Sequence, residues 1–300
     1  SFVDFCKSDF AWYPEIEKSH LTTQLNFLTD VNGIMCVDEI VRFENLQKDF
    51  DDFITLFNDQ KYKPDMLKIY PTLVVPDTGL YKMYKEGKFE PYTTEEVVDL
   101  LARVKKEVPP WVRIMRIQRE ISEEYIEAGT SKGNIRELII ERMKQRGDKC
   151  ECIRCREIGL KQLKEKLEIN KYDVEIKNTN YESSGGEEYF ISAEEKNTKS
   201  LIGFVRMRIP SNKAHRREIV GNTAIIRELH VYGQVVPIGE RDAKSWQHKG
   251  TGTKLMQEAE RLAKEELSIR KLLVISAVGT REYYKRLGYE LEGPYMIKIL

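Results

Sequence analysis

The stretch Gln247-His248-Lys249-Gly250-Thr251-Gly252 separates two segments of different periodicity. Before it, residues 224–238 are apolar and β-branched, which predicts a strand. After it, residues 253–267 carry apolar residues on one face and Lys and Glu on the other, which predicts an amphipathic helix. A glycine-rich turn at a helix N-terminus directs unpaired N–H groups and the positive end of the helix dipole to one point. The stretch therefore predicts a phosphate-binding turn, and a glycine turn that only caps the helix is the alternative.

The residues that follow extend this pattern. Residues 271–278 (KLLVISAV) form a continuous apolar run typical of a buried strand, and residues 280–287 predict a short helix ended by Gly288. This order of elements resembles the acetyl-CoA site of the GNAT acetyltransferase superfamily. The resemblance implies that the turn holds the CoA pyrophosphate and that the pantetheine lies in the splay between the two strands.

The same resemblance implies the site residues. The family tyrosine that protonates the leaving thiolate matches Tyr284, four residues before Gly288, and Tyr283 is the next candidate. Both tyrosines filling the core is the alternative. Glu228 shares a strand face with His230 and Tyr232, and any of the three is able to activate water or an amine near the thioester. The residues expected to bind acetyl-CoA are Gln247, His248, Lys249, Gly250, Thr251, Gly252, Val236 and Ile238.

Composition indicates a globular protein of roughly two domains, because the chain has 300 residues, of which 41% are hydrophobic and 33% charged. It contains no apolar run of 18 or more residues, so we expect no transmembrane helix, and no N-terminal signal pattern is present. Five unevenly spaced cysteines argue against a disulfide framework and favour a reducing cytoplasm.

Charge is distributed unevenly although the formal net charge is zero. Residues 1–60 carry a net charge of −8, and residues 101–168 carry +5. A basic middle region indicates an anionic partner, although a solvated, charge-rich helical surface gives the same counts.

Residues 61–149 contain strand and helix signals in alternation. Thr93 and Glu96 form a predicted capping box that opens a helix to about Glu107. After the break at Pro109-Pro110, residues 112–117 predict a strand, and residues 135–146 predict a helix. Alternating strands and helices indicate βα units, but there are too few for a closed barrel.

Several long strings in this region and beyond resemble the family of Elongator catalytic subunits. They are PDMLKIYPTLVV, GLYKMYKEGKFEPYT, PPWVRIMRIQREI, CECIRCREIG, IRELHVYG and GTREYYKRLGYELEGPYM, in the family's order over residues 45–300. The resemblance implies an α/β chain with a GNAT-type domain after part of a radical-SAM βα barrel. It also implies that acetyl-CoA supplies a two-carbon unit for 5-carboxymethylation of the tRNA wobble uridine.

The expected domains are a leader over residues 1–60, either the chain's own or of foreign origin, a basic partial barrel over 61–149, a zinc-binding linker over 150–170 and the GNAT-type domain over 171–300. Gln24 to Phe53 resemble the tail of the carbohydrate-type sulfotransferases, but without a phosphosulfate-binding loop this likeness carries no activity.

The chain departs from the Elongator family at one essential feature. The resemblance implies S-adenosylmethionine and a 4Fe–4S cluster, and the cluster needs three closely spaced cysteines early in the barrel, a motif that this sequence does not contain. We therefore expect the chain to lack the iron–sulfur half and to be limited to tRNA-stimulated binding or hydrolysis of acetyl-CoA.

Cys150, Cys152 and Cys155 place three thiols within six residues, a spacing that suits a tetrahedral zinc with one further ligand. The family resemblance implies a structural site of three cysteines and one histidine. His230 is the favoured fourth ligand and His215 the second candidate. A cysteine cluster without metal is the alternative.

A run of basic residues surrounds Trp111 and predicts a surface for the single-stranded tRNA anticodon, through phosphate contacts and base stacking. A charged helix end and strand edge would have the same composition. The predicted tRNA-binding residues are Lys105, Lys106, Arg113, Arg116 and Arg119.

Two other functions compete with a tRNA-modifying acyltransferase: a protein lysine N-acetyltransferase, and a tRNA-binding module without catalysis. The family resemblance implies other Elongator-type subunits or a second copy of the chain as partners.

Overall fold

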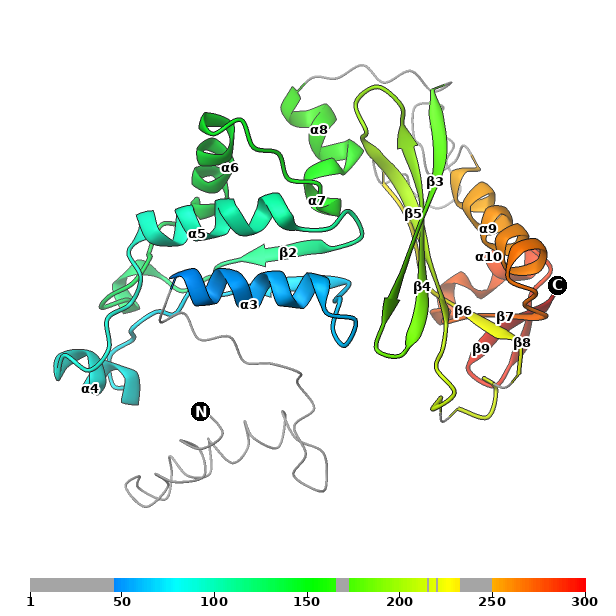
Figure 1. The fold of residues 1–300 in the computed structure, drawn as a ribbon, viewed down its shortest axis with the longest axis horizontal. Coiled ribbons are helices and arrows are strands. Elements are labelled where there is room, and N and C mark those ends of the chain that lie inside the picture. Colours follow the sequence, from blue (N-terminus) through cyan, green and yellow to red (C-terminus); the bar gives the residue numbers. More distant parts are fainter. Residues whose placement is uncertain (1–45, 166–172, 215, 220, 233–249) are drawn as a thin grey trace. The chain divides into compact units, whose positions relative to one another are not determined.

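The structure is a computed structural model that describes residues 46–165, 173–214, 216–219, 221–232 and 250–300 (Figure 1). The chain divides into two compact units, residues 1–53 and 54–300, and helix α3 (Leu46–Asn58) spans the boundary between them. The strand end expected over residues 233–238 lies outside the described residues.

A seven-stranded sheet forms the C-terminal part of the second unit, with the strand order β3-β4-β5-β6-β7-β9-β8. All neighbouring strands are antiparallel except β6 and β7. The strands are β3 (Val174–Ser183), β4 (Gly186–Glu195), β5 (Leu201–Ile209), β6 (Thr223–Val231), β7 (Lys271–Val274), β8 (Glu290–Glu292) and β9 (Tyr295–Ile299).

A tight turn joins β3 to β4. Ser183 pairs with Gly186, and the two residues between them, Ser184 and Gly185, have φ angles of 47° and 70°. Two consecutive positive φ angles are those of the hairpin turns whose twist matches that of the strands. The run Ser183-Ser184-Gly185-Gly186 thus contains the whole connection between the two strands.

Helix α9 (Thr251–Arg261) covers one face of this sheet, as Figure 1 shows. Its buried Leu255, Met256 and Ala259 belong to the same core cluster as the apolar residues of β4 and β5. A π-helical turn, η4 (Leu262–Glu266), continues the helix. The predicted amphipathic helix is therefore present, and its apolar stripe faces the sheet for the reason that the periodicity implied.

The parallel strands β6 and β7 part after a short shared stretch. They pair from Thr223 with Lys271 to Ile226 with Val274, and β6 then continues to Val231 beside β5 alone. The helix that follows β7 in the chain, α10 (Arg281–Arg286), comes after the single turn η5 (Val278–Thr280). A gap between two parallel strands is thus created at the end of β7.

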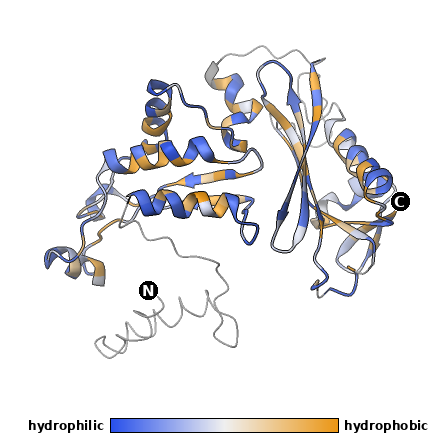
Figure 2. Ribbon diagram, in the orientation of Figure 1, coloured by the Kyte–Doolittle hydropathy of each residue, from blue (hydrophilic) through white to orange (hydrophobic). Residues whose placement is uncertain are grey.

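The first part of the second unit holds a two-stranded parallel sheet of β1 (Met66–Ile69) and β2 (Arg113–Ile117). Helices α5 (Thr94–Glu107) and α6 (Ile135–Gln145) accompany it, and α5 shows hydrophilic and hydrophobic sides in Figure 2. The capping box of Thr93 and Glu96 is confirmed, with both reciprocal hydrogen bonds present. The strand and helix predicted over residues 112–117 and 135–146 are confirmed as β2 and α6.

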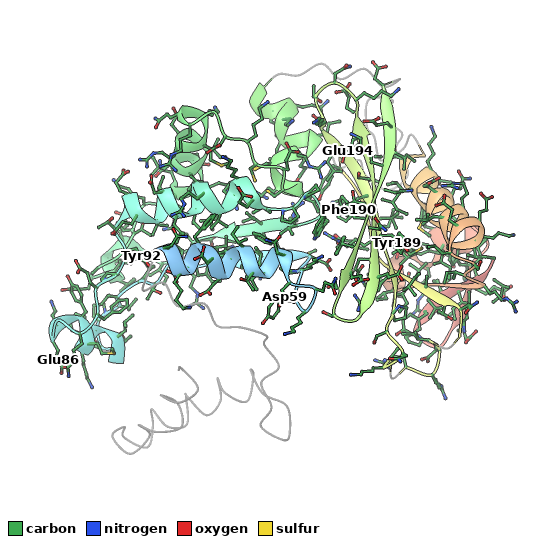
Figure 3. All side chains as sticks on the ribbon, viewed as in Figure 1. Asp59, Glu86, Tyr92, Tyr189, Phe190 and Glu194 are labelled. Carbon is green, nitrogen blue, oxygen red and sulfur yellow. The ribbon has the colours of Figure 1, made fainter. Side chains whose placement is uncertain are left out.

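Two short helices, α7 (Ile153–Arg156) and α8 (Ile158–Glu165), link the two sheets. Arg156 is buried, and its guanidinium donates to Glu194 Oε1 on β4 at 2.6 Å and to the carbonyl of Pro110 at 2.8 Å. Glu194 and Phe190 are labelled on β4 in Figure 3. The Arg156 side chain therefore holds the linker both to β4 of the large sheet and to the Pro110 segment before β2.

The described chain also contains α4 (Gly79–Lys85), η2 (Glu123–Tyr125) and two isolated bridges, Val74 with Ala128 and Glu157 with Leu201. None of the helices in the described ranges is both long and apolar enough to cross a membrane.

Candidate active site and cysteine cluster

A pocket of about 280 Å³ lies at the splay between β6 and β7. Leu229 and Val231 on β6 form one wall, and the start of α9 together with Tyr283 of α10 forms the other. The lining residues are Leu229, Val231, Gly250, Gly252, Thr253 and Tyr283. Strand, glycine turn and short helix therefore meet at one cavity.

The N-terminus of α9 opens at this pocket. Gly250 is the N-cap residue in the left-handed conformation with φ 75° and ψ 11°, which a residue with a Cβ adopts only with strain. The first N–H groups of the helix have no acceptor within the helix, and the dipole is positive there. Gly250, Thr251 and Gly252 of the predicted phosphate turn are described, whereas Gln247, His248, Lys249, Val236 and Ile238 lie outside the described residues.

Gly252 borders the pocket so closely that a side chain would narrow it. A Cβ added there would lie 3.0 Å from the Tyr283 hydroxyl and 3.6 Å from Val231 Cγ2. We expect Gly252→Ala to weaken acetyl-CoA binding about tenfold, since overpacking typically costs about 1–3 kcal/mol and about 1.4 kcal/mol is a factor of ten. Isothermal titration calorimetry with acetyl-CoA measures this.

The matched control for that change is Gly159→Ala in α8, where an added Cβ meets nothing within 4 Å. We expect G159A to bind like the wild type. An unchanged dissociation constant for G252A would contradict the expectation that acetyl-CoA binds in this pocket.

The two tyrosines of α10 have different environments. Tyr284 is a core residue, 7% exposed, packed edge-on against Tyr289. Tyr283 lines the pocket beside Thr253, which is the one side chain that interacts with its buried hydroxyl, and no hydrogen bond of good geometry to that hydroxyl forms among the described residues. Burial raises the pKa of Tyr283 above that of a free phenol, so the hydroxyl is protonated at neutral pH. Tyr283, the second candidate of the sequence analysis, therefore lines the cavity, whereas Tyr284, the first candidate, lies in the core.

Glu228, His230 and Tyr232 share one face of β6, as the strand alternation predicted. The Glu228 carboxylate accepts a hydrogen bond from Arg206 Nε at 2.9 Å, and the Tyr232 hydroxyl accepts one from Arg113. His230 stacks on Phe204 with ring centroids 6.0 Å apart. Burial, with a contribution from Arg113, lowers the pKa of His230, so its imidazole is neutral at pH 7.

Arg206 on β5 holds Glu228 and is itself fully buried, with 1% of its side chain exposed. Its other nitrogens donate to Asp65 Oδ1 at 3.1 Å and to the carbonyl of Trp111 at 2.7 Å. Its guanidinium carbon lies 5.2 and 5.1 Å from the ring centroids of Phe190 and Phe204. This residue therefore ties the strand that carries Glu228 to the segments before β1 and β2, and its sequence signal was a charge inside the apolar run LIGFVRMRI.

The three cysteines of the linker gather as predicted. The Sγ atoms of Cys150, Cys152 and Cys155 all lie within 4.8 Å of one another, and Cys152 is fully buried. Neighbouring sulfurs in a tetrahedral zinc site with bonds of about 2.3 Å lie about 3.8 Å apart, so the cluster fits such an ion after a small contraction. Within the described ranges this is the one group of side chains able to hold a metal.

The favoured fourth ligand, His230, is not part of this group. Its ring lies on β6 between Phe204 and Tyr232, with the Tyr232 ring centroid 4.4 Å away. Strand register fixes that position, because His230 pairs with Phe204 of β5. His215, the second candidate, lies outside the described residues.

The basic run predicted for tRNA is divided by the structure. Lys105 is fully buried, with its Nζ 3.3 Å from Cys150 Sγ and 3.4 Å from Cys155 Sγ. Arg113 is 19% exposed and donates to Glu157 as well as to Tyr232. Lys105 is buried because of the helical periodicity of α5. It falls on the same buried face as Val98 and Leu101, and Val108 at the end of the helix continues that face.

The other three basic residues reach the surface. Lys106 pairs with Asp148 at 3.0 Å and is 55% exposed, and Arg116 is 52% exposed. Arg119 is exposed and lies 5.7 Å from the Tyr70 ring centroid. Trp111 instead stacks on Tyr181 with ring centroids 4.2 Å apart, so this face of its ring is not available for stacking with an RNA base.

Comparison with known families agrees with this arrangement. Residues 64–145 match the radical-SAM C-terminal domain, and residues 155–289 match the acetyltransferase (GNAT) family. Fold and pocket thus define a GNAT-type acetyltransferase domain preceded by the C-terminal part of a radical-SAM domain.

Individual proteins give the closer relationship. Elongator complex protein 3 of Danio rerio is 46% identical over 85% of this chain and 46% of its own length, and that of Saccharomyces cerevisiae is 46% identical over 84% and 45%. A solved structure, the archaeal Methanocaldococcus infernus Elp3 with an N-terminal deletion (1–46), has 42% identity and a TM-score of 0.80, covering 86% of this chain and 61% of that one. The chain is a homologue of Elongator complex protein 3 and spans about half the length of these curated relatives.

Proposed function

We propose that the chain uses acetyl-CoA to modify tRNA, with the wobble uridine as the acceptor of a carboxymethyl group in the complete system. The observation that carries this proposal is the pocket at the β6–β7 splay, which combines a glycine-opened helix N-terminus with a protonated tyrosine. Homology to Elongator complex protein 3 supports the choice of tRNA.

The N-terminus of α9 would bind the CoA pyrophosphate through the N–H groups that follow Gly250, together with the predicted turn residues 247–249. The acyl-pantetheine chain would run along Leu229 and Val231 toward Tyr283. The apolar walls exclude water from this part of the cofactor, which strengthens every polar interaction inside the pocket.

In thioester hydrolysis, water attacks the acetyl carbon, the C–S bond breaks, and the thiolate leaves with the bonding electron pair. We assign Tyr283 the proton that converts this thiolate to free CoA thiol, because its hydroxyl faces the pocket and is protonated at neutral pH. The proton of the attacking water would return to Tyr283 through solvent, because Glu228 and His230 alternate with Leu229 and Val231 along β6 and so lie on the face opposite to the pocket lining.

The exposed members of the basic run, Lys106, Arg116 and Arg119, are the residues to which we assign tRNA contacts. Lys105 and Arg113 are engaged inside the protein and are left out of this assignment. The β3–β4 turn is too short to form a binding surface for an acceptor. Other segments would therefore have to bind the tRNA.

We further assign the three cysteines to a structural zinc ion. The three cysteines are free, as expected in a reducing cytoplasm, so their thiolates are available as ligands. They would supply three of the zinc ligands, and the metal would cross-link the linker. S-adenosylmethionine and a 4Fe–4S cluster would belong to a part of the family's sequence that this chain does not match. Other Elongator-type subunits or a second copy of the chain are the partners that we infer from the family.

Hydrolysis of acetyl-CoA by the purified chain, with and without tRNA, tests the proposal. We expect tRNA to increase the release of free thiol about tenfold, within the coupling free energies of about 1–3 kcal/mol that are usual between two binding sites. Charge reversal of both Arg116 and Arg119 to Glu should remove the stimulation and keep the basal rate. The matched control is Arg217→Glu. Arg217 is 92% exposed and lies between β5 and β6, so this variant should keep the stimulation by tRNA.

The alternatives give different results in the same assay. Transfer to peptide lysines that is indifferent to tRNA would identify a protein acetyltransferase. Tight tRNA binding with no thiol release would identify a tRNA-binding module without catalysis, and either result would overturn the proposal.

A further inference from the structure

The helix that carries Tyr283 is too short to fix its own orientation. α10 has six residues, and a helix of this length is not stable by itself in water. Gly288, with a φ of 87°, follows the C-cap residue Leu287 and ends the helix. The last carbonyls of a helix have no partner within it, so contacts with other elements have to satisfy them and orient α10.

Lys298 of β9 supplies such a contact. Its Nζ donates to the Leu287 carbonyl at 2.9 Å and to Glu260 Oε2 at 2.7 Å. The lysine stem passes beside Gly288, where an added Cβ would lie 3.7 Å from Lys298 Cε. A cation at a helix C-terminus also interacts favourably with the negative end of the helix dipole. Because Glu260 lies in the last turn of α9, Lys298 connects the end of α10 to α9.

Tyr289 occupies the second oxygen of the same carboxylate. Its hydroxyl donates to Glu260 Oε1 at 2.9 Å, and the residue is 1% exposed. Burial, with the Glu260 carboxylate beside it, raises the pKa of Tyr289, so the hydroxyl keeps the proton that it donates. The Tyr289 ring packs edge-on against Tyr284, which packs edge-on against Tyr283. A series of direct contacts therefore runs from Glu260 of α9 to the tyrosine that lines the pocket.

α10 thus meets α9 at two places. In the first turn of α9, a Cβ added at Gly252 would lie 3.0 Å from the Tyr283 hydroxyl. In the last turn of α9, Glu260 binds both Lys298 and Tyr289. Contacts at opposite ends of α9 fix both the distance and the tilt of α10, and with them the position of the Tyr283 hydroxyl.

We propose that Glu260, Tyr289 and Lys298 are positioning residues that hold the Tyr283 hydroxyl at the acetyl-CoA pocket, and we call these three residues the α10 brace. This inference depends on the proposed function, in which Tyr283 protonates the leaving thiolate. Without the charge of Lys298, the Glu260 carboxylate loses its cation and the Leu287 carbonyl loses its donor. α10 is then free to shift against α9, and a displacement of about 1 Å is enough to lower a rate about 100-fold.

Three variants of the full chain test the α10 brace. Lys298→Met has similar length and no charge, Lys298→Arg keeps the charge, and Lys285→Met is the matched control. Lys285 lies in α10 itself, is 54% exposed and pairs with Glu282 at the surface. Steady-state release of CoA thiol gives kcat and KM, and calorimetry gives the dissociation constant of acetyl-CoA.

We expect K298M to lower kcat by about 10–100-fold, because the acid is displaced from the thiolate. The dissociation constant of acetyl-CoA should stay the same, since the glycine turn of α9 is untouched and the lost interaction belongs to the transition state. K298R should recover part of kcat, and K285M should match the wild type. A kcat of K298M equal to that of the wild type would overturn the proposal.

Combination with Tyr283→Phe separates positioning from a general loss of stability. Because Lys298 acts through the Tyr283 hydroxyl, removing it from a chain that already lacks that hydroxyl should not slow turnover further, so Y283F/K298M should match Y283F. A further fall by the same factor as in the wild type would show an effect on the whole domain and overturn the α10 brace. Full turnover in Y283F alone would overturn the acid of the proposed function and the brace with it, a result distinct from failure of the brace alone.

Tyr289→Phe decides the question if K298M does not fold. It removes one oxygen and keeps the ring that packs against Tyr284. Differential scanning calorimetry shows which variants are folded at the temperature of the assay. We expect Y289F to lower kcat about tenfold with no change in the dissociation constant of acetyl-CoA. With K298M unfolded, an unchanged kcat in Y289F would overturn the proposal.

Discussion

Replacing Tyr283 by phenylalanine is expected to lower the turnover of acetyl-CoA by about 10²–10⁴-fold, the range typical of a positioned general acid. The reason is that Tyr283 lines the pocket, while burial keeps the pKa of its hydroxyl raised and the proton in place. Binding of acetyl-CoA should change little, since the ring remains. Steady-state release of CoA thiol and calorimetric binding together separate the two effects.

Tyr284→Phe is the control that the chain itself offers. Tyr284 stands next in sequence but lies in the core, where Tyr283 and Tyr289 pack edge-on against it. We expect Y284F to retain turnover within a small factor. The opposite order, with Y284F inactive and Y283F active, would mean that the thiolate is protonated from the core side and that the acid is misassigned.

Arg206→Met is expected to lower the free energy of unfolding by about 3–5 kcal/mol, because removing one partner of a buried ion pair leaves the others without compensation. Arg206 is 1% exposed, and it neutralises Glu228 and Asp65 while it bonds the carbonyl of Trp111. Asp65 retains Arg227 at 2.5 Å, but Glu228 loses its partner on β5. At about 2–4 °C per kcal/mol, the melting temperature should fall by roughly 10 °C.

Differential scanning calorimetry of R206M beside Arg217→Met measures this loss. Arg217 is 92% exposed, and surface substitutions of this kind usually stay within about 0.5 kcal/mol. A melting temperature of R206M within a degree of that of R217M would show that the two parts of the unit do not depend on this side chain.

Much of the fold follows from local sequence. The capping box at Thr93, the amphipathic pattern of α9 and the glycine at position 250 are each decided by residues within one or two helical turns. The spacing of the three cysteines likewise brings their sulfurs together, because six residues cannot separate them far. These are the features for which sequence analysis predicted the acetyl-CoA site and the metal site.

The assignments that tertiary structure changed all depend on contacts distant in sequence. Tyr283 and Tyr284 are adjacent and chemically equal, and only the packing of α10 against α9 and Tyr289 decides which hydroxyl meets the pocket. Lys105 and Lys106 differ in the same way, since one falls on the buried face of α5 beside sulfurs 45 and 50 residues away. His230 has its position from pairing with β5, which separates it from the cysteines.

Local patterns thus determined the elements, the glycine turn and the two kinds of chemistry, because propensity, capping and periodicity act over a few residues. Tertiary structure alone decided which of two neighbouring side chains faces a cavity, a thiol or solvent. Arg206 is the clearest case: its partners Asp65 and Trp111 lie 141 and 95 residues away, so its role exists only once the strands have paired.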